Sequence, residues 1–425
     1  MALSVLPEQM LVVVGQGYVG LPLAVRAALV GYRVVGFDLD QSKIKALQSG
    51  NSPIEDVLSA TLQLAVDSGR YLPSDKESDC SDFDIALITV PTPLKDGNPD
   101  LSYIESAGAM LARHLKEGAL VVLESTTYPG TTTEVLAPIL EEGSGLRAGR
   151  DFYLGYSPER IDPGNKSWTL TNTPKVVSGI DDASLDKVRN FYNTIVTSTI
   201  PVSGTAEAEL TKLLENTFRH VNVALVNELA ILASDLGVDI WEAIDAASTK
   251  PFGYMPFRPG PGVGGHCLPI DPSYLSWRIK RRLGRSFRFV ELANEVNSRM
   301  PDHVVWRVTE TLSKLGKEIR ECRILLLGLS YKPNTGDARE SPALVVADRL
   351  ITLGAKVRAI DPYISFDDVP FEIDRAEASI EEYQKADCVI LLIDHRDFDL
   401  EEVAKYSKFV FDTRHRVIGD NVEYL

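Results

Sequence analysis

One glycine-rich turn near the N-terminus constrains the fold of this chain more than any other feature. Gly15, Gly17 and Gly20 form a GxGxxG pattern between an apolar, strand-like run (Leu11 to Val14) and a helix-like segment (Leu21 to Leu29). In a βαβ unit, the first glycine permits a tight turn, the second lets a pyrophosphate approach the helix N-terminus, and the third lets the helix pack on the strand. The pattern therefore predicts a dinucleotide-binding domain, and a glycine turn that binds nothing is the weaker alternative.

An acidic residue at the end of the next strand indicates which dinucleotide binds. The strand-like run Arg33 to Phe37 ends at Asp38, whose carboxylate would accept hydrogen bonds from the adenosine ribose hydroxyls. This favours NAD over NADP, because Asp38 would repel a 2′-phosphate and no Arg or Lys follows it immediately. Lys43 is too far along the chain to reverse that preference, but we count it among the cofactor-binding residues together with Tyr18 and Val19 of the turn.

Polar residues follow two further strand-like runs in the N-terminal half. These runs, Ile85 to Val90 and Leu120 to Leu123, are typical of buried parallel strands. Loops at the carboxyl ends of such strands form the ligand crevice of doubly wound sheets, so Thr92, Ser125 and Thr126 are candidate cofactor-binding residues. For any one of them, a turn residue that caps the next helix is an equally good interpretation.

The pattern changes to long helices near Ala206. Apolar residues recur at spacings of three and four over some forty residues, which predicts one long helix followed by a shorter one. A long helix between two α/β halves commonly serves as a spine and as a subunit interface. We therefore expect a homodimer or a higher homo-oligomer.

The C-terminal part repeats the plan of the N-terminus. A strand (Arg323 to Leu327), a turn at Gly328, a helix (Ala343 to Leu353) and a strand (Lys356 to Ile360) lead to an acid, Asp361. The turn lacks GxGxxG, so this unit is expected to bind something other than a dinucleotide. The predicted fold is α/β, with two Rossmann-like, doubly wound parallel-sheet domains joined by a central long helix or helical domain. The expected domains are 1–200 for NAD binding, 201–316 for the central helices and 317–425 for the C-terminal unit.

Charge and cysteine usage exclude several classes of protein. The 425 residues carry a formal charge of −16, so nucleic acid and anionic membranes are unfavourable partners. No window of 18 uncharged apolar residues predicts a transmembrane helix, and no basic segment precedes an apolar run at the start, so we expect a cytoplasmic protein. The four cysteines form no CxxC pair and no metal-ligand spacing, which predicts neither a disulfide framework nor a metal site.

One of those cysteines lies in an unusual place. Cys267 stands in FRPGPGVGGHCLPIDP (Phe257 to Pro272), a loop rich in glycine and proline where a thiol has no evident packing role. Glycines let backbone approach a ligand closely, so we interpret Cys267 as a nucleophile. From the loop alone, a segment that merely turns the chain is an equal alternative.

Motifs along nearly the whole chain resemble one enzyme family. In order, GQGYVGLPLA, VPTP, ESTTYPGTT, YSPERIDPGN, ELTKLLENTFRHVNVALVNELA, PGPGVGGHCLPIDP and LGLSYKPNTGDARESPAL resemble the motifs of the UDP-glucose/GDP-mannose dehydrogenase family, from about Met10 to Asp412. The sequence around the cysteine is most similar to that of the branch that acts on UDP-N-acetylhexosamines, especially UDP-N-acetylglucosamine. The resemblance implies an NAD-dependent, four-electron oxidation of the C6 alcohol of a UDP-sugar to a uronate, and a C-terminal domain that binds the UDP-sugar.

The resemblance also implies roles for individual residues. Cys267 would attack the intermediate aldehyde and give a thiohemiacetal, and loss of a second hydride would give a thioester. Lys212 and Asn216, four apart on one helix face, would stabilise the developing oxyanion. Asp271 would assist through water as a base or orienting group, Glu159 would act as general acid/base or position the hydrolytic water, and Thr126 would hold that water. Without a catalytic role, Lys212 would be a solvated helix lysine, Asp271 a turn carboxylate and Glu159 an exposed loop residue.

A further set of residues matches the family's binding groups. Arg339 would reach back toward the cofactor. The substrate-binding set is Glu159, Arg160, Lys212, Asn216, Arg258, Gly264, Gly265, Tyr331 and Lys332. His266 replaces a small residue of UDP-glucose dehydrogenases, and Pro163 replaces a second glutamate, which argues against plain UDP-glucose as the substrate. His266 either lowers the pKa of the neighbouring thiol or shapes the loop.

Several functions therefore stay open at the level of sequence. UDP-N-acetylmannosamine and UDP-glucose are alternative substrates for the same chemistry. A two-electron oxidation of hydroxyacid type would fit the fold but leave Cys267 without a task, and a nucleotide-binding regulator would use the fold without catalysis. The yield of NADH per sugar separates these functions, because it would be two, one or none.

Overall fold

The computed structural model describes residues 9–54, 56–95, 97–161, 165, 167–265, 268, 270–365, 369 and 373–425. The chain forms two compact units, one of Met1–Glu215 with Ser273–Arg278 and one of Asn216–Pro272 with Ile279–Leu425. The boundary between them falls inside one continuous helix, α7 (Thr205–Leu236). The division into three domains that the sequence suggests stays a prediction.

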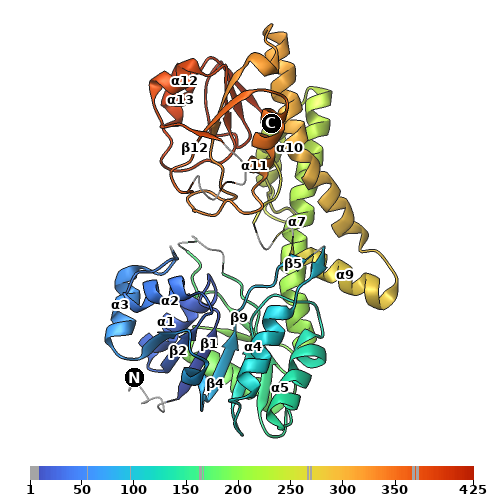
Figure 1. Ribbon diagram of the computed structural model, residues 1–425. Helices are drawn as coiled ribbons and strands as arrows, with labels where there is room; N and C mark the ends of the chain where they lie inside the picture. The colour runs from blue at the N-terminus through green and yellow to red at the C-terminus, as the bar shows by residue number, and fades with distance from the viewer. Residues whose placement is uncertain are drawn as a thin grey trace. The chain divides into compact units, whose positions relative to one another are not determined.

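The first unit contains a sheet of eight described strands that is parallel except where β8 meets β9 (Figure 1). In spatial order the strands are β10 (Thr199–Pro201), β9 (Lys175–Gly179), β8 (Tyr153–Tyr156), β7 (Leu120–Leu123), β4 (Ile85–Ile88), β1 (Met10–Val14), β2 (Arg33–Phe37) and β3 (Tyr71–Ser74). A small hairpin of β5 (Leu94–Lys95) and β6 (Asn98–Pro99) follows β4. The strand order reverses direction around β1, which places the carboxyl ends of β1 and β4 at the switch point where doubly wound sheets bind ligands.

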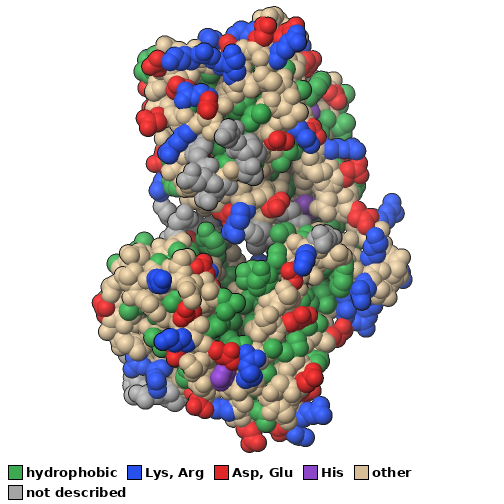
Figure 2. Space-filling view, in the orientation of Figure 1, with side chains coloured by type: hydrophobic (Ala, Val, Ile, Leu, Met, Phe, Trp, Pro, Cys, Tyr) green, Lys and Arg blue, Asp and Glu red, His purple; other side chains and the backbone are tan. Residues whose placement is uncertain are grey.

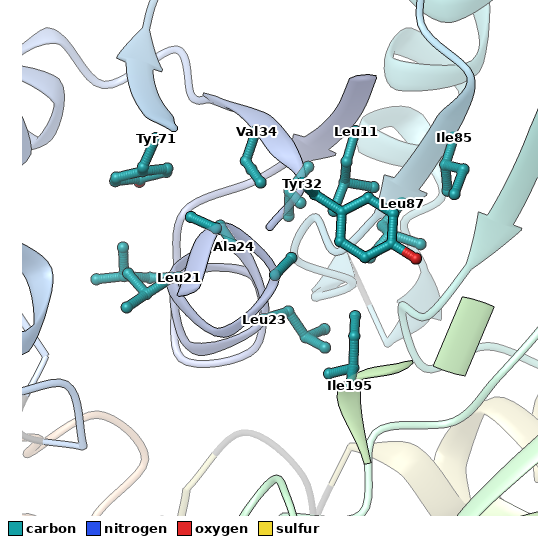
Figure 3. Packing of buried hydrophobic residues seen from close by; sticks show 14 of the residues in the cluster. Leu11, Leu21, Leu23, Ala24, Tyr32, Val34, Tyr71, Ile85, Leu87 and Ile195 are labelled. Carbon is teal, nitrogen blue, oxygen red and sulfur yellow. The ribbon is translucent and has the colours of Figure 1, made fainter. Parts of the chain in front are cut away.

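Helices cover both faces of this sheet. They are α1 (Gly20–Val30), α2 (Gln41–Gln48), α3 (Ser59–Asp67), α4 (Ser102–Ala112), α5 (Ala137–Ser144) and α6 (Asp182–Ile195), with a 3₁₀ turn, η1 (Glu77–Cys80), and a π-helical turn, η2 (Thr132–Leu136). Leu11 of β1 packs in a cluster with residues of α1 and α6, whereas Val12 packs in a second cluster with residues of α4 and α5. Figure 3 shows α1 end-on, with Ala24 on the side of the helix that faces Val34 of β2 and Leu23 directed toward Ile195 of α6. Burial on both faces explains why β1 is an unbroken apolar run.

The second unit is built around a parallel sheet of six described strands. In spatial order they are β13 (Asp374–Arg375), β12 (Lys356–Ile360), β11 (Arg323–Leu327), β14 (Cys388–Leu391), β15 (Val410–Asp412) and β16 (Val422–Tyr424). Its helices are α8 (Ile240–Ser248), α10 (Arg288–Lys314), α11 (Pro342–Thr352), α12 (Ile380–Lys385) and α13 (Leu400–Tyr406), with a 3₁₀ turn, η3 (Ile319–Glu321). Alternate residues of β11 again face opposite cores, since Ile324 packs with α10 and α11 while Leu325 packs with α12 and α13. The predicted fold class is confirmed.

Two long helices were not part of the sequence prediction. They are α9 (Asp271–Leu283), which contributes to both units, and α10, which contains Pro301. A proline inside a helical pattern normally ends or kinks a helix, and this hides the continuity of α10. Its buried residues, such as Val304 and Val308, pack on the sheet of the second unit and offset that cost.

Charge is distributed unevenly over the surface. The last turn of α9 carries Lys280, Arg281 and Arg282, and Figure 2 shows Lys and Arg side chains gathered over this helix. Cations at a helix C-terminus interact favourably with the helix dipole, so this basic cluster stabilises α9 within a chain whose formal charge is −16. Among the described residues, no helix is both long and apolar enough to cross a membrane.

Candidate active site

The three positions of the N-terminal turn are glycine for different physical reasons. A Cβ on Gly20 would lie 1.9 Å from the Gly15 carbonyl oxygen, and a Cβ on Gly15, whose φ is +95°, would lie 2.9 Å from the Thr89 carbonyl oxygen. A Cβ on Gly17 would meet nothing within 4 Å. Gly15 and Gly20 are therefore required by the turn itself, whereas Gly17 borders open space at the start of α1. That is the space and the helix end that a pyrophosphate needs, so the turn fits a dinucleotide.

Hydrogen bonds fix the Asp38 carboxylate beside this turn. Its Oδ2 accepts hydrogen bonds from the Gln16 backbone N–H at 2.8 Å and from Lys43 Nζ at 2.8 Å. Lys43 thus lies closer to Asp38 than its distance along the sequence suggests, because Asp40 caps α2 and the first turn of that helix folds back. Asp38 and Lys43 are brought together as a pair that can share the ribose hydroxyls.

A buried polar network supports the turn from below, and the sequence did not predict it. The Tyr71 hydroxyl donates to Gln16 Oε1 at 2.7 Å, and Gln16 Nε2 donates to the Val13 carbonyl at 2.8 Å. Burial raises the pKa of Tyr71, and the Asp38 charge raises it further, so the phenol stays protonated as a donor. A Cβ on Gly36 would lie 2.6 Å from both Gln16 Oε1 and the Tyr71 ring, which explains the glycine inside β2.

The crevice residues at the ends of β4 and β7 differ in their environment. Ser125 is buried and its hydroxyl donates to the Val90 carbonyl at 2.7 Å, so its oxygen is left as an acceptor. It bridges two strand ends rather than capping a helix. Thr92 and Thr126 are partly buried on the loops that follow the same two strands.

Next to them lies a buried cluster of three charged side chains. Lys175 Nζ donates to Glu124 Oε2 at 2.6 Å and to Glu159 Oε2 at 3.2 Å. Glu124, Glu159 and Lys175 are 1%, 8% and 3% exposed. Glu159 Oε1 also accepts hydrogen bonds from the backbone N–H groups of Arg160 and Ile161, both at 2.6 Å. Glu159 is therefore not an exposed loop residue.

The pKa values of the two carboxyl groups in this cluster shift in opposite directions. Burial acts to raise the pKa of Glu159, but the charge of Lys175, the hydrogen bond from Ile161 and the charge of Lys212 outweigh it and hold the pKa below its usual range. Burial raises the pKa of Glu124 despite the same lysine. Lys175 stays charged, because its two carboxylate partners outweigh its burial and raise its pKa. Glu159 is thus the group kept ionised.

The start of α7 contributes to the same surroundings. Lys212 is partly buried and its charge acts on Glu159, so these two predicted site residues lie together. Arg160, predicted to bind substrate, donates from Nε to Glu215 Oε1 at 2.9 Å and from Nη1 to the Pro174 carbonyl at 2.7 Å. Its guanidinium is therefore engaged within the protein and fastens the Glu159 segment to α7.

One turn after Lys212, the helix carries a second buried pair. Asn216 Nδ2 donates to Asp271 Oδ2 at 2.5 Å, and the two residues are 5% and 3% exposed. Asp271 is therefore not a solvated turn carboxylate. His266 and Cys267, which precede it in the loop, lie outside the described residues.

The loop after β11 meets the glycines of that same segment. A Cβ on Gly264 would lie 2.6 Å from the Glu340 carbonyl oxygen, and a Cβ on Gly265 would lie 2.6 Å from the Tyr331 ring. The predicted substrate-binding residues Gly264, Gly265 and Tyr331 are thus brought together, with Lys332 next in sequence. Glu340 adopts a left-handed φ of 51°, and such strain concentrates at binding sites. Arg339 of this loop is paired with Asp337 through two hydrogen bonds of 2.9 and 2.8 Å.

Asp361, the counterpart of Asp38 in the second unit, has no capacity left for a ribose. Its carboxylate accepts hydrogen bonds from Leu329 N, Ser330 N, Tyr363 N and His395 Nε2, at 2.7 to 3.1 Å. The acid therefore secures the protein's own loop, which explains how this unit can keep the Rossmann plan without a dinucleotide motif.

Arg258 lies apart from these residues, in a cavity of about 410 Å³ within the second unit. The cavity lining is Trp241, Asp245, Arg258, Pro259, Asp394, Arg414, His415 and Arg416. Arg258 pairs with Asp245 at 2.5 Å and Arg416 with Asp394 at 2.8 Å, while Arg414 Nε donates to a backbone carbonyl. Three guanidinium groups against two carboxylates make the cavity suited to an anion. Sequence reasoning missed Arg414 and Arg416, although a basic run directly after a strand, as in DTRHR, is a usable signal.

Comparison with known proteins agrees with this architecture. Three models of the UDP-glucose/GDP-mannose dehydrogenase family match the chain: the NAD binding domain over residues 9–196, the central domain over 206–299 and the UDP binding domain over 325–420. A UDP-N-acetyl-D-mannosamine dehydrogenase of Pyrococcus horikoshii is 37% identical over 96% of this chain and 94% of its own length. A UDP-N-acetyl-D-glucosamine 6-dehydrogenase of Pseudomonas aeruginosa is 34% identical over 96% and 97%.

A solved structure gives the same answer for the fold. The structure of a UDP-D-ManNAc dehydrogenase from Pyrococcus horikoshii superimposes with a TM-score of 0.89 at 34% identity and covers 98% of this chain and 99% of its own. With the glycine turn and three matching domain models in agreement, the chain belongs to the UDP-glucose/GDP-mannose dehydrogenase family and is an NAD-dependent nucleotide-sugar dehydrogenase.

Proposed function

We propose that this enzyme oxidises the C6 alcohol of a UDP-N-acetylhexosamine, with UDP-N-acetylglucosamine favoured, to the uronate through a thiohemiacetal and a thioester on Cys267. The observation that carries the proposal is the buried pair of Asn216 and Asp271, joined at 2.5 Å, in which Asp271 stands four residues after the cysteine in the sequence. A buried amide and carboxylate supply the donor and acceptor that oxidation of an alcohol and thioester chemistry require.

The first oxidation needs a group that stabilises the developing alkoxide at C6. NAD, when bound, supplies the hydride acceptor for each of the two oxidations. Lys212 and Asn216 occupy one face of α7 and offer a cation and an amide N–H to the C6 oxygen. Asp271 holds the Asn216 amide and accepts the proton of the alcohol through water.

The second oxidation needs a tetrahedral carbon that still carries a hydrogen. The Cys267 thiolate forms a C–S bond to the aldehyde carbon, and the resulting thiohemiacetal loses hydride to become a thioester. Water then attacks the thioester, its proton passes to a carboxylate, and the C–S bond breaks to release the uronate and the thiolate. Each sugar alcohol thus consumes one water and yields two NADH.

Glu159 is the carboxylate that suits the hydrolytic step. A carboxyl group whose pKa lies below its usual range is ionised at neutral pH, so it can accept a proton from water but has none to donate. Of general acid and general base, the role we propose for Glu159 is therefore that of base or orienting group, and Thr126 is proposed to hold that water.

The UDP portion of the substrate is assigned to the second unit. Gly264 and Gly265 pack closely against the segment of Tyr331, and the lysine that follows that tyrosine, Lys332, provides charge for a phosphate. The cavity of Arg258 offers further forked donors for a diphosphate, and a stacked pair of rings, Trp241 and His415, for a base.

The test of the nucleophile is substitution of the cysteine. Cys267→Ser is expected to abolish uronate formation while leaving the affinity for NAD and UDP-sugar within a few fold of wild type. Cys322→Ser is a matched control, because Cys322 is buried and donates to a backbone carbonyl at 3.2 Å, which a serine can also do. Uronate formation at the wild-type rate by Cys267→Ser would remove the cysteine from the mechanism.

The test of the substrate is a panel of UDP-sugars with NADH and uronate both quantified. We expect two NADH per sugar and a higher kcat/KM for UDP-N-acetylglucosamine than for UDP-glucose. UDP-N-acetylmannosamine is the second candidate, and the 37% identity to the Pyrococcus horikoshii relative favours it. A higher kcat/KM for UDP-glucose than for both hexosamines would contradict the proposal.

We also propose that the enzyme is a homodimer formed through α7. Large apolar side chains with 42% to 78% exposure recur along this helix at spacings of three, four and seven: Leu210, Leu214, Phe218, Leu225, Leu229, Leu232 and Leu236. The stripe is about 39 Å long at a rise of 1.5 Å per residue. A two-fold axis places the same patch of both subunits in contact, so a second copy of the chain would cover this apolar stripe with an identical one.

Light scattering during gel filtration tests this arrangement. The double change Leu225→Glu and Leu229→Glu should convert the dimer to a monomer, whereas Arg219→Glu on the same helix should not. An unchanged mass for the double variant would refute the interface.

A further inference from the structure

The buried lysine of the first unit has no role in the reaction described above. Lys175 begins β9, Glu124 follows β7 and Glu159 follows β8, so three different strands bring one cation and two anions together. Lysine is rarely buried, and the few buried lysines are paired with carboxylates. Apolar residues often stabilise a fold as well as a buried ion pair does. The burial of Lys175 therefore points to a role beyond joining the strands.

The geometry around Lys175 is asymmetric. Glu124 is the nearer partner, at 2.6 Å against 3.2 Å, and the Tyr192 hydroxyl donates to its other oxygen. Lys175 Nζ also lies 5.3 Å from the centre of the Tyr192 ring. Glu124 and Tyr192 therefore fix where the ammonium group sits, and one of its remaining protons is directed at Glu159.

Glu159 is held from both of its oxygens. Oε1 is bound by the N–H groups of Arg160 and Ile161, and Oε2 is bound by Lys175. The charged and titratable groups that act on this carboxylate are Lys175, Lys212, Glu124 and Tyr192. Of these, Lys175 is the cation hydrogen-bonded to it.

We propose that Lys175 is a positioning residue that keeps the Glu159 carboxylate ionised and oriented toward the water that hydrolyses the thioester, with Glu124 as the anchor of the lysine. This inference rests on the hydrolytic role proposed above for Glu159. It assigns no contact between Lys175 and the substrate, since the lysine acts through Glu159.

The consequence is specific to one half of the reaction. Both hydride transfers precede hydrolysis, so loss of Lys175 should leave them intact and slow only the release of uronate. Glu159 would then retain burial without its principal cation, and its pKa would rise. In the dependence of kcat on pH, kcat falls at low pH because Glu159 becomes protonated. This acid limb of the profile should move to higher pH.

The test compares Lys175→Met with wild type in rapid-mixing measurements of NADH at saturating NAD and UDP-N-acetylhexosamine. We expect an initial burst of two NADH per site in both enzymes. In Lys175→Met the steady rate after the burst should fall at least about tenfold, the acid limb should move up by about one pH unit, and intact-protein mass spectrometry should find the sugar bound to the enzyme.

Three further variants separate positioning from folding. Lys175→Arg keeps the charge and should restore most of the steady rate. Lys187→Met is the matched control, because Lys187 is an exposed lysine over the Tyr153 ring in the same unit, and it should behave as wild type. Lys175→Met combined with Glu124→Gln removes one cation and one anion, so the cluster keeps its net charge and the fold, while the acid limb should still be displaced.

Equal loss of the burst and of the steady rate in Lys175→Met and in the double variant, with the acid limb unmoved, would overturn the inference. That result would leave the proposed function intact, because wild type would still form two NADH per sugar. Absence of NADH from wild type with every UDP-sugar would instead overturn the proposed function and the role of Glu159 with it.

Discussion

A buried carboxyl group near the start of α7 allows a quantitative prediction about stability and pH. Glu209 is fully buried and accepts hydrogen bonds from Gly130 N, Thr132 N and Thr132 Oγ1 at 2.5 to 2.8 Å. Burial raises its pKa from 4.5 to about 7, more than these three donors lower it, and the charge of Glu134 adds to the rise. Glu209→Gln removes the titrating group and keeps an acceptor oxygen.

The sign and size follow from proton linkage. Between pH 4.5 and 7 the folded state binds the Glu209 proton more tightly than the unfolded state, so stability falls as pH rises through this window. The full difference, 7 minus 4.5 at about 1.36 kcal/mol per pH unit, is about 3.4 kcal/mol. Because the isoelectric point is near 4.9, the usable range begins at about pH 5.5, and between there and about pH 8 the expected loss is about 2 kcal/mol.

Amide hydrogen exchange of the 128–136 segment measures this loss locally. The opening free energy of this segment, corrected for the intrinsic pH dependence of exchange, should fall by about 2 kcal/mol across that range in wild type. It should be nearly independent of pH in Glu209→Gln. Glu207→Gln, an exposed carboxylate two residues earlier on the same helix, should retain the wild-type slope. Equal slopes in Glu209→Gln and wild type would refute the reasoning.

Three further predictions concern the turn, its support and the second unit. Gly17→Ala should leave the melting temperature unchanged but weaken NADH binding measured by fluorescence, whereas Gly20→Ala, with its Cβ 1.9 Å from a carbonyl oxygen, should lower the melting temperature by several degrees; equal melting temperatures would contradict this. Tyr71→Phe should cost about 1 to 3 kcal/mol in urea unfolding, because it leaves Gln16 Oε1 buried without its donor, and a neutral effect would argue against the network. Burial lowers the pKa of His303 to about 4, so the second unit should lose about 1 kcal/mol from pH 7.5 to 5.5, a loss that His303→Leu should remove and that hydrogen exchange of α10 would detect.

Much of the fold follows from local pattern. The runs Arg33 to Phe37, Leu120 to Leu123 and Arg323 to Leu327 form strands with the predicted bounds, because continuous apolar runs between turn residues have few other ways to be buried. The long helix likewise begins at Thr205, next to the predicted position. The unpredicted α10 shows the limit, since its interior proline is tolerated only through packing on the second sheet.

For the candidate site as well, the sequence determined some features and the tertiary structure decided others. Sequence alone determined the residue types and their order, namely a glycine turn with an acid after the next strand, a lysine and an asparagine four apart, and a cysteine in a glycine loop. Tertiary structure alone decided which charges meet, because a charged side chain selects its partner by distance in space. Lys175 lies 51 residues from Glu124 and 16 from Glu159, and at the start of a strand it reads as a solvated lysine. Only packing of three strands turns it into the buried cation that governs Glu159, since burial and pairing are properties of the folded chain.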